Sequence, residues 1–228
     1  PINAIKIYSD KEVDEIVLLD ITASKENRPP NFDLIQEMVE ESIFSPISYG
    51  GGVRDFDVAL EIIRRGCEKI IINSYGVKNP DFISKLSKSL GSQSVCVSID
   101  VKKNFFGKYK IYTHSGTKET SEDITKFPKF IQDKGAGEIF LNAIDRDGTW
   151  SGYDLDLIKM VCDSTSIPVS VCGGASSIKD FILAIKNGAN GCAAGSMAVY
   201  QGKDLGVLIN FPSKYIKENW NDLRKMYL

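Results

Sequence analysis

Strand-forming and helix-forming segments alternate along this chain from end to end, and this alternation limits the possible fold more than any other feature. Several strand-like segments are continuously apolar, which is typical of parallel strands that are buried on both faces. Alternating βα units predict an α/β domain built on a parallel sheet. The candidate strands are residues 15–21, 46–51, 69–74, 94–101, 138–145, 167–173 and 191–196.

The helices between these strands have recognisable ends. Asp55 and Ser177 each stand where an N-cap residue is expected, and Pro80 stands in the first turn of a third helix. A glycine follows each helix, which is the usual residue at a helix C-terminus. These glycines are Gly66, Gly188 and Gly91.

One segment, "YKIYTHSG" at residues 109–116, interrupts the alternation. It follows the strand at 94–101 closely, with Gly107 available for a turn, so we expect a hairpin insertion near residues 105–116. A chain of 228 residues is long enough to bury a large core. We therefore predict a single domain over residues 1–228.

An internal repeat favours a barrel over a doubly wound sheet. In the second half "SID", "NAIDRDG", "VCGGASS" and "AAGS" follow in order, and "LLDITAS", "YGGGVRD" and "INSYG" in the first half match the last three. Asp20 and Gly51 are 31 residues apart, and Asp145 and Gly173 are 28 apart. The partner of "SID" would fall before Pro1. We predict a (β/α)8 barrel of the duplicated half-barrel, phosphate-binding type, with strands 2 to 8 present and the first strand absent from this chain.

Two of the strands end in glycine pairs, and we interpret both ends as phosphate-binding sites. Glycine lets a phosphate approach the backbone, and the N–H groups of the following helix then point at it. Plain turns are the alternative explanation, because turns use glycine freely. The first site would combine Gly51, Gly52, Asn73 and Ser74; the second would combine Gly173, Gly174, Gly195 and Ser196, with Ser115 and Gly116 nearby.

Three carboxylates end strands on the same rim: Asp100, Asp145 and Asp147. Asp100 could serve as a general acid or base if its surroundings raise its pKa. The alternative is a helix cap or an ion pair with Lys102 or Lys103. The single histidine, His114, falls in the hairpin loop, where we expect it to be exposed and without a role.

Composition excludes several classes of protein. The formal net charge is −2 and no long basic run occurs, so nothing favours binding to nucleic acid. Nothing in the sequence suggests a membrane span, a signal peptide, a metal-ligand cluster or a cofactor. The five cysteines lack a CxxC pair and are expected to be buried thiols of a reducing compartment, so the predicted location is the cytoplasm. The chain starts at Pro1 without methionine, so its beginning is expected to be missing.

Several motifs together resemble the cyclase subunit of imidazole glycerol phosphate synthase. They are "LLDITAS", "YGGGVRDF", "IINS", "SID", "GAGEIFLNAIDRDGTWSGYD" and "GGASS", and the similarity runs from Pro1 to about Tyr200. That family consists of (β/α)8 barrels of histidine biosynthesis. Its members are lyases that take ammonia from a glutaminase partner in a heterodimer. With it they convert a bis-phosphorylated ribulosyl aminoimidazole carboxamide nucleotide to imidazole glycerol phosphate and aminoimidazole carboxamide ribotide.

The resemblance also implies roles for particular residues. Asp100 matches one of two catalytic aspartates, the other of which belongs to the first strand, and Asp147 and Gly148 match positions at the substrate site. Ammonia enters that family at the opposite, N-terminal end of the barrel, through a ring of charged residues. The matching positions are Glu15, Lys69 and Glu138. From the residues alone, such charges at strand starts are a solvated face or an ion-pair ring.

Some positions depart from the family pattern. Tyr75 would bring bulk to the first phosphate site, and Asn142 stands where a threonine is common. The segment at 200–216 is more similar to a paralogue linked to surface-polysaccharide (lipopolysaccharide) genes, in which ammonia from a glutaminase serves to amidate a nucleotide sugar. Three hypotheses therefore stay open: a cyclase, an ammonia-conducting partner of that second kind, and another phosphate-binding barrel such as an isomerase.

Overall fold

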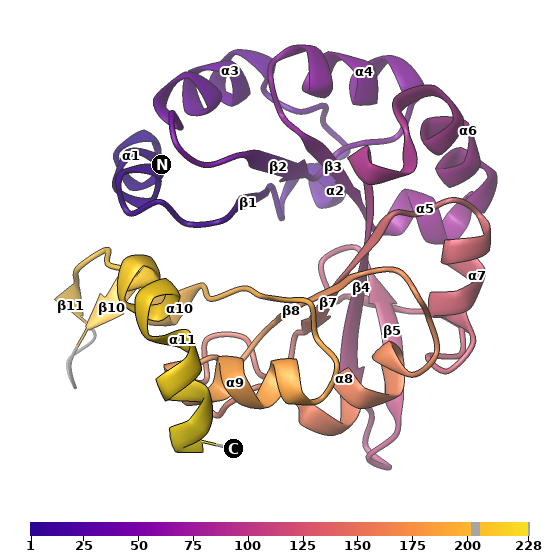
Figure 1. Ribbon diagram of the computed structural model, residues 1–228. Coiled ribbons are helices and arrows are strands. Elements are labelled where there is room, and N and C mark those ends of the chain that lie inside the picture. The colour runs from indigo at the N-terminus through magenta and orange to yellow at the C-terminus, as the bar shows by residue number, and fades with distance from the viewer. Residues whose placement is uncertain (202–205, 228) are drawn as a thin grey trace.

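The computed structural model describes residues 1–201 and 206–227, and a curved parallel sheet with helices on its outer side dominates it (Figure 1). The residues at 202–205, which belong to the segment compared with the paralogue, lie outside the described part. The strands are β1 (Ile16–Leu19), β2 (Ile47–Gly50), β3 (Lys69–Ile72), β4 (Val95–Lys103), β5 (Tyr109–Thr113), β6 (Lys118–Glu119), β7 (Glu138–Ala143), β8 (Val169–Cys172), β9 (Gly191–Cys192), β10 (Tyr200–Gln201) and β11 (Gly206–Val207).

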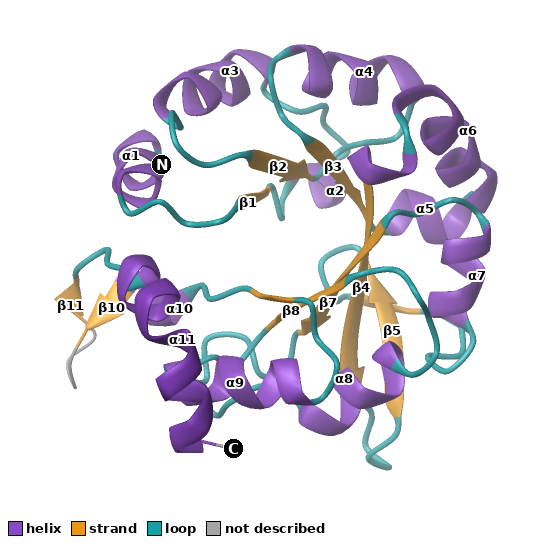
Figure 2. Ribbon diagram, viewed as in Figure 1, coloured by secondary structure: helices purple, strands orange, loops and turns teal. Residues whose placement is uncertain are grey.

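Helices connect successive parallel strands, as the alternation in the sequence predicts (Figure 2). They are α1 (Ile2–Asp10), α2 (Ala23–Glu26), α3 (Phe32–Glu41), α4 (Phe56–Arg64), α5 (Ser74–Lys78), α6 (Pro80–Leu90), the 3₁₀ turn η1 (Ser92–Ser94), α7 (Phe127–Asp133), α8 (Leu155–Cys162), α9 (Ile178–Lys186), α10 (Ser196–Val199) and α11 (Ser213–Tyr227).

The main sheet has the strand order β1-β2-β3-β4-β7-β8-β9, and every neighbouring pair along this path is parallel. Among the residues that the structure describes, β1 and β9 at the two ends of the path do not pair with each other. The curl of the sheet and the helices on its convex side give the α/β architecture of a (β/α)8 barrel, which confirms the predicted fold class.

The helix ends predicted from the sequence are present. The Asp55 side chain accepts a hydrogen bond from the Val58 amide at the start of α4, and Ser177 forms a capping box at the start of α9. Pro80 is the first residue of α6, and Gly91 follows its last. The strand predicted at 191–196 is shorter in the structure. β9 covers only Gly191–Cys192, and the short helix α10 already begins at Ser196.

The segment that interrupts the alternation forms an antiparallel pair with β4. Residues of β4 from Asp100 to Lys103 lie opposite residues of β5 from Tyr112 back to Tyr109. A short third strand, β6, pairs with β5. This hairpin therefore extends β4 past the end of the parallel sheet, and the loop after β5 returns towards the sheet.

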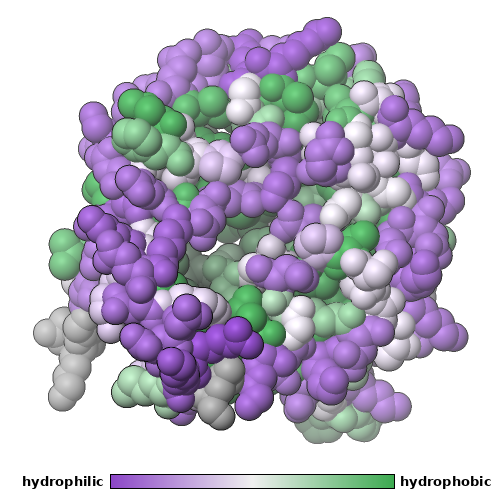
Figure 3. Space-filling model, viewed as in Figure 1, coloured by the Kyte–Doolittle hydropathy of each residue, from purple (hydrophilic) through white to green (hydrophobic). Residues whose placement is uncertain are grey.

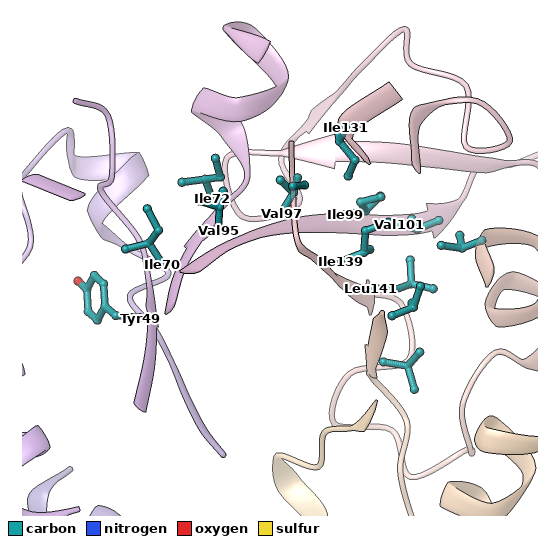
Figure 4. Packing of buried hydrophobic residues seen from close by; sticks show 14 of the residues in the cluster. Tyr49, Ile70, Ile72, Val95, Val97, Ile99, Val101, Ile131, Ile139 and Leu141 are labelled. Carbon is teal, nitrogen blue, oxygen red and sulfur yellow. The ribbon is translucent and has the colours of Figure 1, made fainter. Parts of the chain in front are cut away.

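Successive residues of each central strand alternate between two hydrophobic environments. In β4 the residues Val95, Val97, Ile99 and Val101 are buried against the helices, and Ile139 and Leu141 in β7 are buried in the same way (Figure 4). Strand geometry directs the intervening side chains to the concave, inner face of the sheet. A small separate cluster lies there: Ile71, Cys96 and Phe140, with Val17, Cys172 and Ala193 packed against them.

Candidate active site

A cavity of about 500 Å³ opens where the central strands end. Leu19, Gly50, Ile71, Asp100 and Asn142, from β1, β2, β3, β4 and β7, all contribute to its lining. Carboxyl ends of parallel strands meet at one edge of a sheet, which explains why residues so distant in sequence converge here. The space-filling view shows the molecule from the opposite side, since α2 and α5, which follow these strand ends, lie at the back of the view; the face towards the viewer is hollowed at its centre, with apolar walls inside a mostly hydrophilic rim (Figure 3).

Asp100 is a half-buried carboxylate of this cavity, and it has no ion-pair partner among the residues that the structure describes. Ser98 Oγ donates a hydrogen bond to its Oδ1 at 3.0 Å. Burial raises the pKa of Asp100 to about 6, and hydrogen bonds from Ser98 and Asn142 limit that rise. The ion pair with Lys102 or Lys103 that the sequence left open does not form. A carboxyl group with such a pKa can both accept and return a proton near neutral pH.

The two lysines that follow Asp100 have other partners. The Lys102 ammonium lies 4.2 Å from the centroid of the Tyr112 ring. The Lys103 ammonium lies 3.7 Å from the nearest oxygen of the buried Asp154. Neither lysine therefore pairs with Asp100, and the pKa of Asp100 stays raised.

Cationic side chains line one side of the cavity. They are Lys25, Arg54 and Lys78, and none of the three has an ion-pair partner among the residues that the structure describes. Arg54 instead donates to the carbonyl oxygen of Arg28 at 3.1 Å. Unpaired cations in a cavity favour an anionic ligand. No sequence motif points to these three residues, although each lies in a loop or short helix directly after a strand, a position that marks candidates for this cavity.

The first predicted phosphate site borders the same cavity. Gly51, Gly52, Asn73 and Ser74 all belong to the lining. The glycines also have a packing reason, because a Cβ on Gly51 would lie 2.5 Å from the carbonyl oxygen of Asp20. Tyr75 lines the cavity too, and its ring packs edge-on against Phe82 with centroids 5.0 Å apart. The ring therefore adds bulk beside this site.

The second predicted site lies elsewhere: none of its four residues, Gly173, Gly174, Gly195 and Ser196, lines the cavity. A Cβ on Gly173 would lie 2.4 Å from the carbonyl oxygen of Ala143, and one on Gly174 would lie 2.3 Å from that of Gly152. The close approach of the loop after β7 therefore explains this glycine pair. Gly195, by contrast, faces open space at the start of α10.

The loop after β5 contributes to the cavity, and here one expectation from the sequence is wrong. His114 is half-buried and lines the cavity instead of being exposed. Its backbone N–H donates to Ser74 Oγ at 2.8 Å, and its Nδ1 lies 3.1 Å from Thr113 Oγ1. Ser115, which also lines the cavity, donates to the Ile21 carbonyl oxygen at 2.6 Å. These contacts fix the loop across the cavity, which local sequence could not reveal.

The loop after β7 carries the remaining predicted residues. Asp147 lines the cavity, whereas Gly148 and Asp145 do not, and neither does Gly116 in the hairpin loop. Asp145 instead accepts from the Lys103 amide at 3.2 Å. Cys172 lies close enough to Asp147 for its charge to matter; burial, assisted by that charge, raises the pKa of Cys172 to about 12. Its thiol is consequently protonated and a poor nucleophile.

A cluster of charged residues lies at the opposite end of the sheet. Lys69 Nζ contacts Glu15 at 2.6 Å and Glu138 at 2.7 Å. Ser48 and Ser170 donate to the same two carboxylates, and the Ser170 bond measures 2.6 Å. Burial alone would lower the pKa of Lys69, but the hydrogen bonds and charges of Glu138 and Glu15 outweigh it and raise that pKa. The structure thus brings together three side chains that are distant in sequence.

The five cysteines are free thiols, of which Cys67 and Cys96 are buried while the other three are half-buried, contrary to the expectation that all are buried. Within residues 1–201 and 206–227, no His, Cys, Asp or Glu side chains cluster as metal ligands would. Within the same ranges, no helix is both long enough and apolar enough to cross a membrane.

Comparisons with known proteins agree on one family. A family model described as histidine biosynthesis protein matches residues 1–204. A Leptospira borgpetersenii protein, provisionally named as the imidazole glycerol phosphate synthase subunit HisF, is 45% identical over 222 residues, which are 96% of this chain and 86% of the relative. A Pseudomonas aeruginosa protein provisionally named hisF2, another subunit of this kind, is 42% identical over 93% of this chain and 84% of its own.

A third relative carries the name without qualification. The imidazole glycerol phosphate synthase subunit HisF of Petrotoga mobilis is 42% identical over 211 residues, covering 91% of this chain and 83% of the relative. The similarity thus extends over nearly all of the sheet described above.

Proposed function

The chain belongs to the histidine biosynthesis protein family, and from that premise we propose that it is the cyclase subunit of an imidazole glycerol phosphate synthase. The reaction combines ammonia with a bis-phosphorylated ribulosyl aminoimidazole carboxamide nucleotide. Its products are imidazole glycerol phosphate and aminoimidazole carboxamide ribotide. The observation that carries the proposal is Asp100, a half-buried carboxyl group with a raised pKa in a cavity that Lys25, Arg54 and Lys78 also line.

Asp100 supplies the proton transfers that such a reaction needs. When ammonia adds to the ketone carbon of the ribulosyl group, the nitrogen must lose a proton and the oxygen must gain one. A base whose pKa lies near the working pH is suited to take the first and return it. Ser98 and Asn142 hold the carboxylate in place by hydrogen bonds. Asp147 and His114, which also face the cavity, are placed to contact the substrate.

The two phosphates of the substrate would bind at the two glycine-lined sites. The first, with Gly51, Gly52, Asn73 and Ser74, gains support from the neighbouring lysines. The second would comprise Gly173, Gly174, Gly195 and Ser196, which lie outside the lining of the cavity, and Ser115, Gly116 and Gly148 are further candidates for contact with the substrate. A similarity between the helix starts supports this pairing: the residues before α5 and α10 have φ, ψ of −121°, −89° and −100°, −89°, and neither provides a side-chain cap. Uncapped N–H groups are available to bind an anion.

We further propose that ammonia enters from a glutaminase subunit docked at the N-terminal end of the barrel. The cluster of Glu15, Lys69 and Glu138 would then act as the gate between the partner and the barrel interior. A cytoplasmic location accords with the free thiols. Reaction inside the barrel keeps ammonia from protonation and dilution in bulk water.

The test is turnover with ammonium salt in excess. The protein as its gene encodes it is mixed with the bis-phosphorylated substrate at mildly alkaline pH, and formation of imidazole glycerol phosphate is followed. We expect turnover that disappears in Asp100→Asn. A folded protein that stimulates a co-encoded glutaminase without turning over this substrate would refute the cyclase assignment and favour the surface-polysaccharide paralogue.

The gate has its own test, which compares two sources of ammonia. In Glu138→Ala we expect the glutamine-supported rate, measured with the glutaminase present, to fall more than the rate supported by ammonium salt. Lys129, which pairs with Asp133 on the exposed side of α7 at 2.6 Å, provides the control substitution Lys129→Ala. Equal losses from both ammonia sources would mean that the charged cluster is structural only.

A further inference from the structure

The tip of the β4–β5 hairpin holds two phenylalanines in water. Phe105 and Phe106 are 97% and 81% exposed, more than any other large apolar residue in the described ranges 1–201 and 206–227. Their rings contact each other edge-on, with centroids 5.6 Å apart. Single exposed apolar residues are ordinary on a protein surface. An adjacent pair of fully presented aromatic rings is instead typical of an interaction site.

A closed turn fixes the backbone that carries these rings. The Asn104 N–H donates to the carbonyl oxygen of Lys108 at 2.9 Å, and the Gly107 N–H donates to that of Asn104 at 2.9 Å. The side-chain oxygen of Asn104 accepts from the amides of Phe106 and Lys108, both at 3.0 Å. Gly107 has a φ of 74°, which glycine adopts without strain. Because the turn is already formed, little conformational entropy is lost when the rings bind a partner.

Positive charge surrounds the two rings. The segment 101–118 contains five lysines and no acidic residue. Neighbouring elements neutralise two of the lysines: Lys103 lies 3.7 Å from Asp154. Lys110 likewise lies 3.3 Å from Glu119. The remaining three have no ion-pair partner within the part of the chain that the structure describes, and they are Lys102, Lys108 and Lys118. The hairpin therefore combines exposed aromatic rings with an excess of cations, although the net charge of the whole chain is −2.

The size of this surface distinguishes between two kinds of partner. A stable interface between proteins buries about 1,200–2,000 Å² in total. No other large apolar residue of segment 101–119 is exposed, so two side chains at a hairpin tip fall short of that area. A lipid surface needs no complementary pocket to receive two rings, and its anionic headgroups attract lysines. In Figure 1 the loop between β4 and β5 reaches the lower edge of the molecule, where a flat surface can meet it.

We propose that the tip of the β4–β5 hairpin docks the protein on the surface of an anionic lipid membrane. Phe105 and Phe106 insert among the headgroups, and the unpaired lysines of the hairpin lie against the lipid phosphates. The tip extends beyond the carboxyl end of β4, whereas the cluster of charged residues lies at the other end of the sheet. Docking therefore leaves the N-terminal end of the barrel free for a glutaminase. This inference goes beyond the proposed function and does not depend on it.

Sedimentation with lipid vesicles tests the docking. The protein as its gene encodes it is mixed with vesicles of phosphatidylcholine and phosphatidylglycerol in equal amounts, or of phosphatidylcholine alone, and the bound fraction is measured. We expect binding to the anionic vesicles that weakens as salt is added. Absence of binding to these vesicles would overturn the proposal and favour a protein partner for the rings. Equal binding to both kinds of vesicle would overturn it too, because the lysines would then have no role.

Substitutions at the tip assign the binding to the hairpin. In Phe105→Ser combined with Phe106→Ser we expect the affinity for anionic vesicles to fall by about tenfold or more. In Lys108→Gln we expect a loss of about fivefold, the usual contribution of one lysine near an anionic surface. The matched control is Ile43→Ser combined with Phe44→Ser, which removes a second exposed apolar pair, in the loop before β2. The control should bind as wild type does, and an equal loss in both double variants would overturn the assignment.

A tryptophan at the tip reports insertion directly. In Phe105→Trp we expect vesicles with brominated acyl chains to quench more fluorescence than they do in wild type, whose Trp150 and Trp220 set the baseline. Quenching that does not exceed this baseline would overturn the insertion of the rings. These measurements need no substrate, so their outcome is independent of whether the protein turns over the histidine-pathway substrate.

Discussion

The two ends of the barrel interior hold carboxylates of the same kind in opposite electrostatic states. At the N-terminal end, Glu15 and Glu138 share the Lys69 ammonium at 2.6 and 2.7 Å. At the C-terminal end, the half-buried Asp100 accepts hydrogen bonds but has no cationic partner in the described part of the chain, and burial raises its pKa to about 6. The difference shows what the lack of a counter-ion does to Asp100: burial is not offset by a cation, so the pKa of this carboxyl group moves towards neutral pH, where it can exchange protons.

The sharpest test of this comparison is Asp100→Asn. We expect cyclase activity to fall by about 10²- to 10⁴-fold, the usual contribution of a general acid or base. The same substitution should raise the free energy of unfolding. The native state holds the Asp100 proton more tightly than the unfolded chain does, so the ionised side chain destabilises the fold at and above pH 6.

The pKa of Asp100 gives the size of the expected gain in stability for Asp100→Asn. A pKa of about 6 against an ordinary 3.8 corresponds to a free energy of unfolding larger by about 3 kcal/mol for Asp100→Asn at pH 7. Below about pH 4 the two proteins should be equally stable. Urea titrations at both pH values measure this difference. A variant that is less stable than wild type at pH 7 would contradict the account of Asp100.

The second test removes the cation from the other end. Lys69→Met leaves two half-buried carboxylates without their cation, and we expect the free energy of unfolding to fall by about 2 kcal/mol, less than for a fully buried pair. Adding Glu138→Gln should restore part of it, because one unpaired charge is removed. If urea titrations find Lys69→Met as stable as wild type, the ion pairs contribute nothing.

A third test concerns the cations beside the cavity. Lys78→Ala removes an unpaired ammonium from the lining, and we expect the KM for the bis-phosphorylated substrate to rise about tenfold with little change in kcat. Lys88, near the end of α6 and outside the lining, is the matched control. Similar KM values for Lys78→Ala and Lys88→Ala would mean that no phosphate binds near Lys78.

The smallest effect is a shift in a pH profile. The rate at saturating ammonia should rise with pH through an apparent pKa near 6, as Asp100 loses its proton. Ser98→Ala removes a hydrogen bond that favours the ionised form, so this limb should move to higher pH. Initial rates between pH 5 and pH 9, with the ammonia concentration held constant, measure the shift. A profile that stays in place, or moves to lower pH, would contradict the role given to Ser98.

Local sequence signals predicted the helix ends and most strand positions correctly, because caps and apolar runs act within a few residues. Asp55 and Pro80 mark helix starts for reasons that do not depend on the rest of the chain. The prediction for His114 was wrong because a loop that is polar in sequence can be covered by a segment from far away. The bond from His114 to Ser74 spans 40 residues and that from Ser115 to Ile21 spans 94.

By itself, the sequence determined the alternating architecture, the repeated glycine ends and the position of Asp100 near the end of a strand, since each depends on residue type and spacing along the chain. Only the tertiary structure decided which charges meet. It joined Lys69 to two glutamates 54 and 69 residues away and placed Lys25 and Lys78 beside the cavity. Hydrogen bonds and charges act through space over a few ångströms, so the curl of the sheet decides their partners, and the order of residues does not.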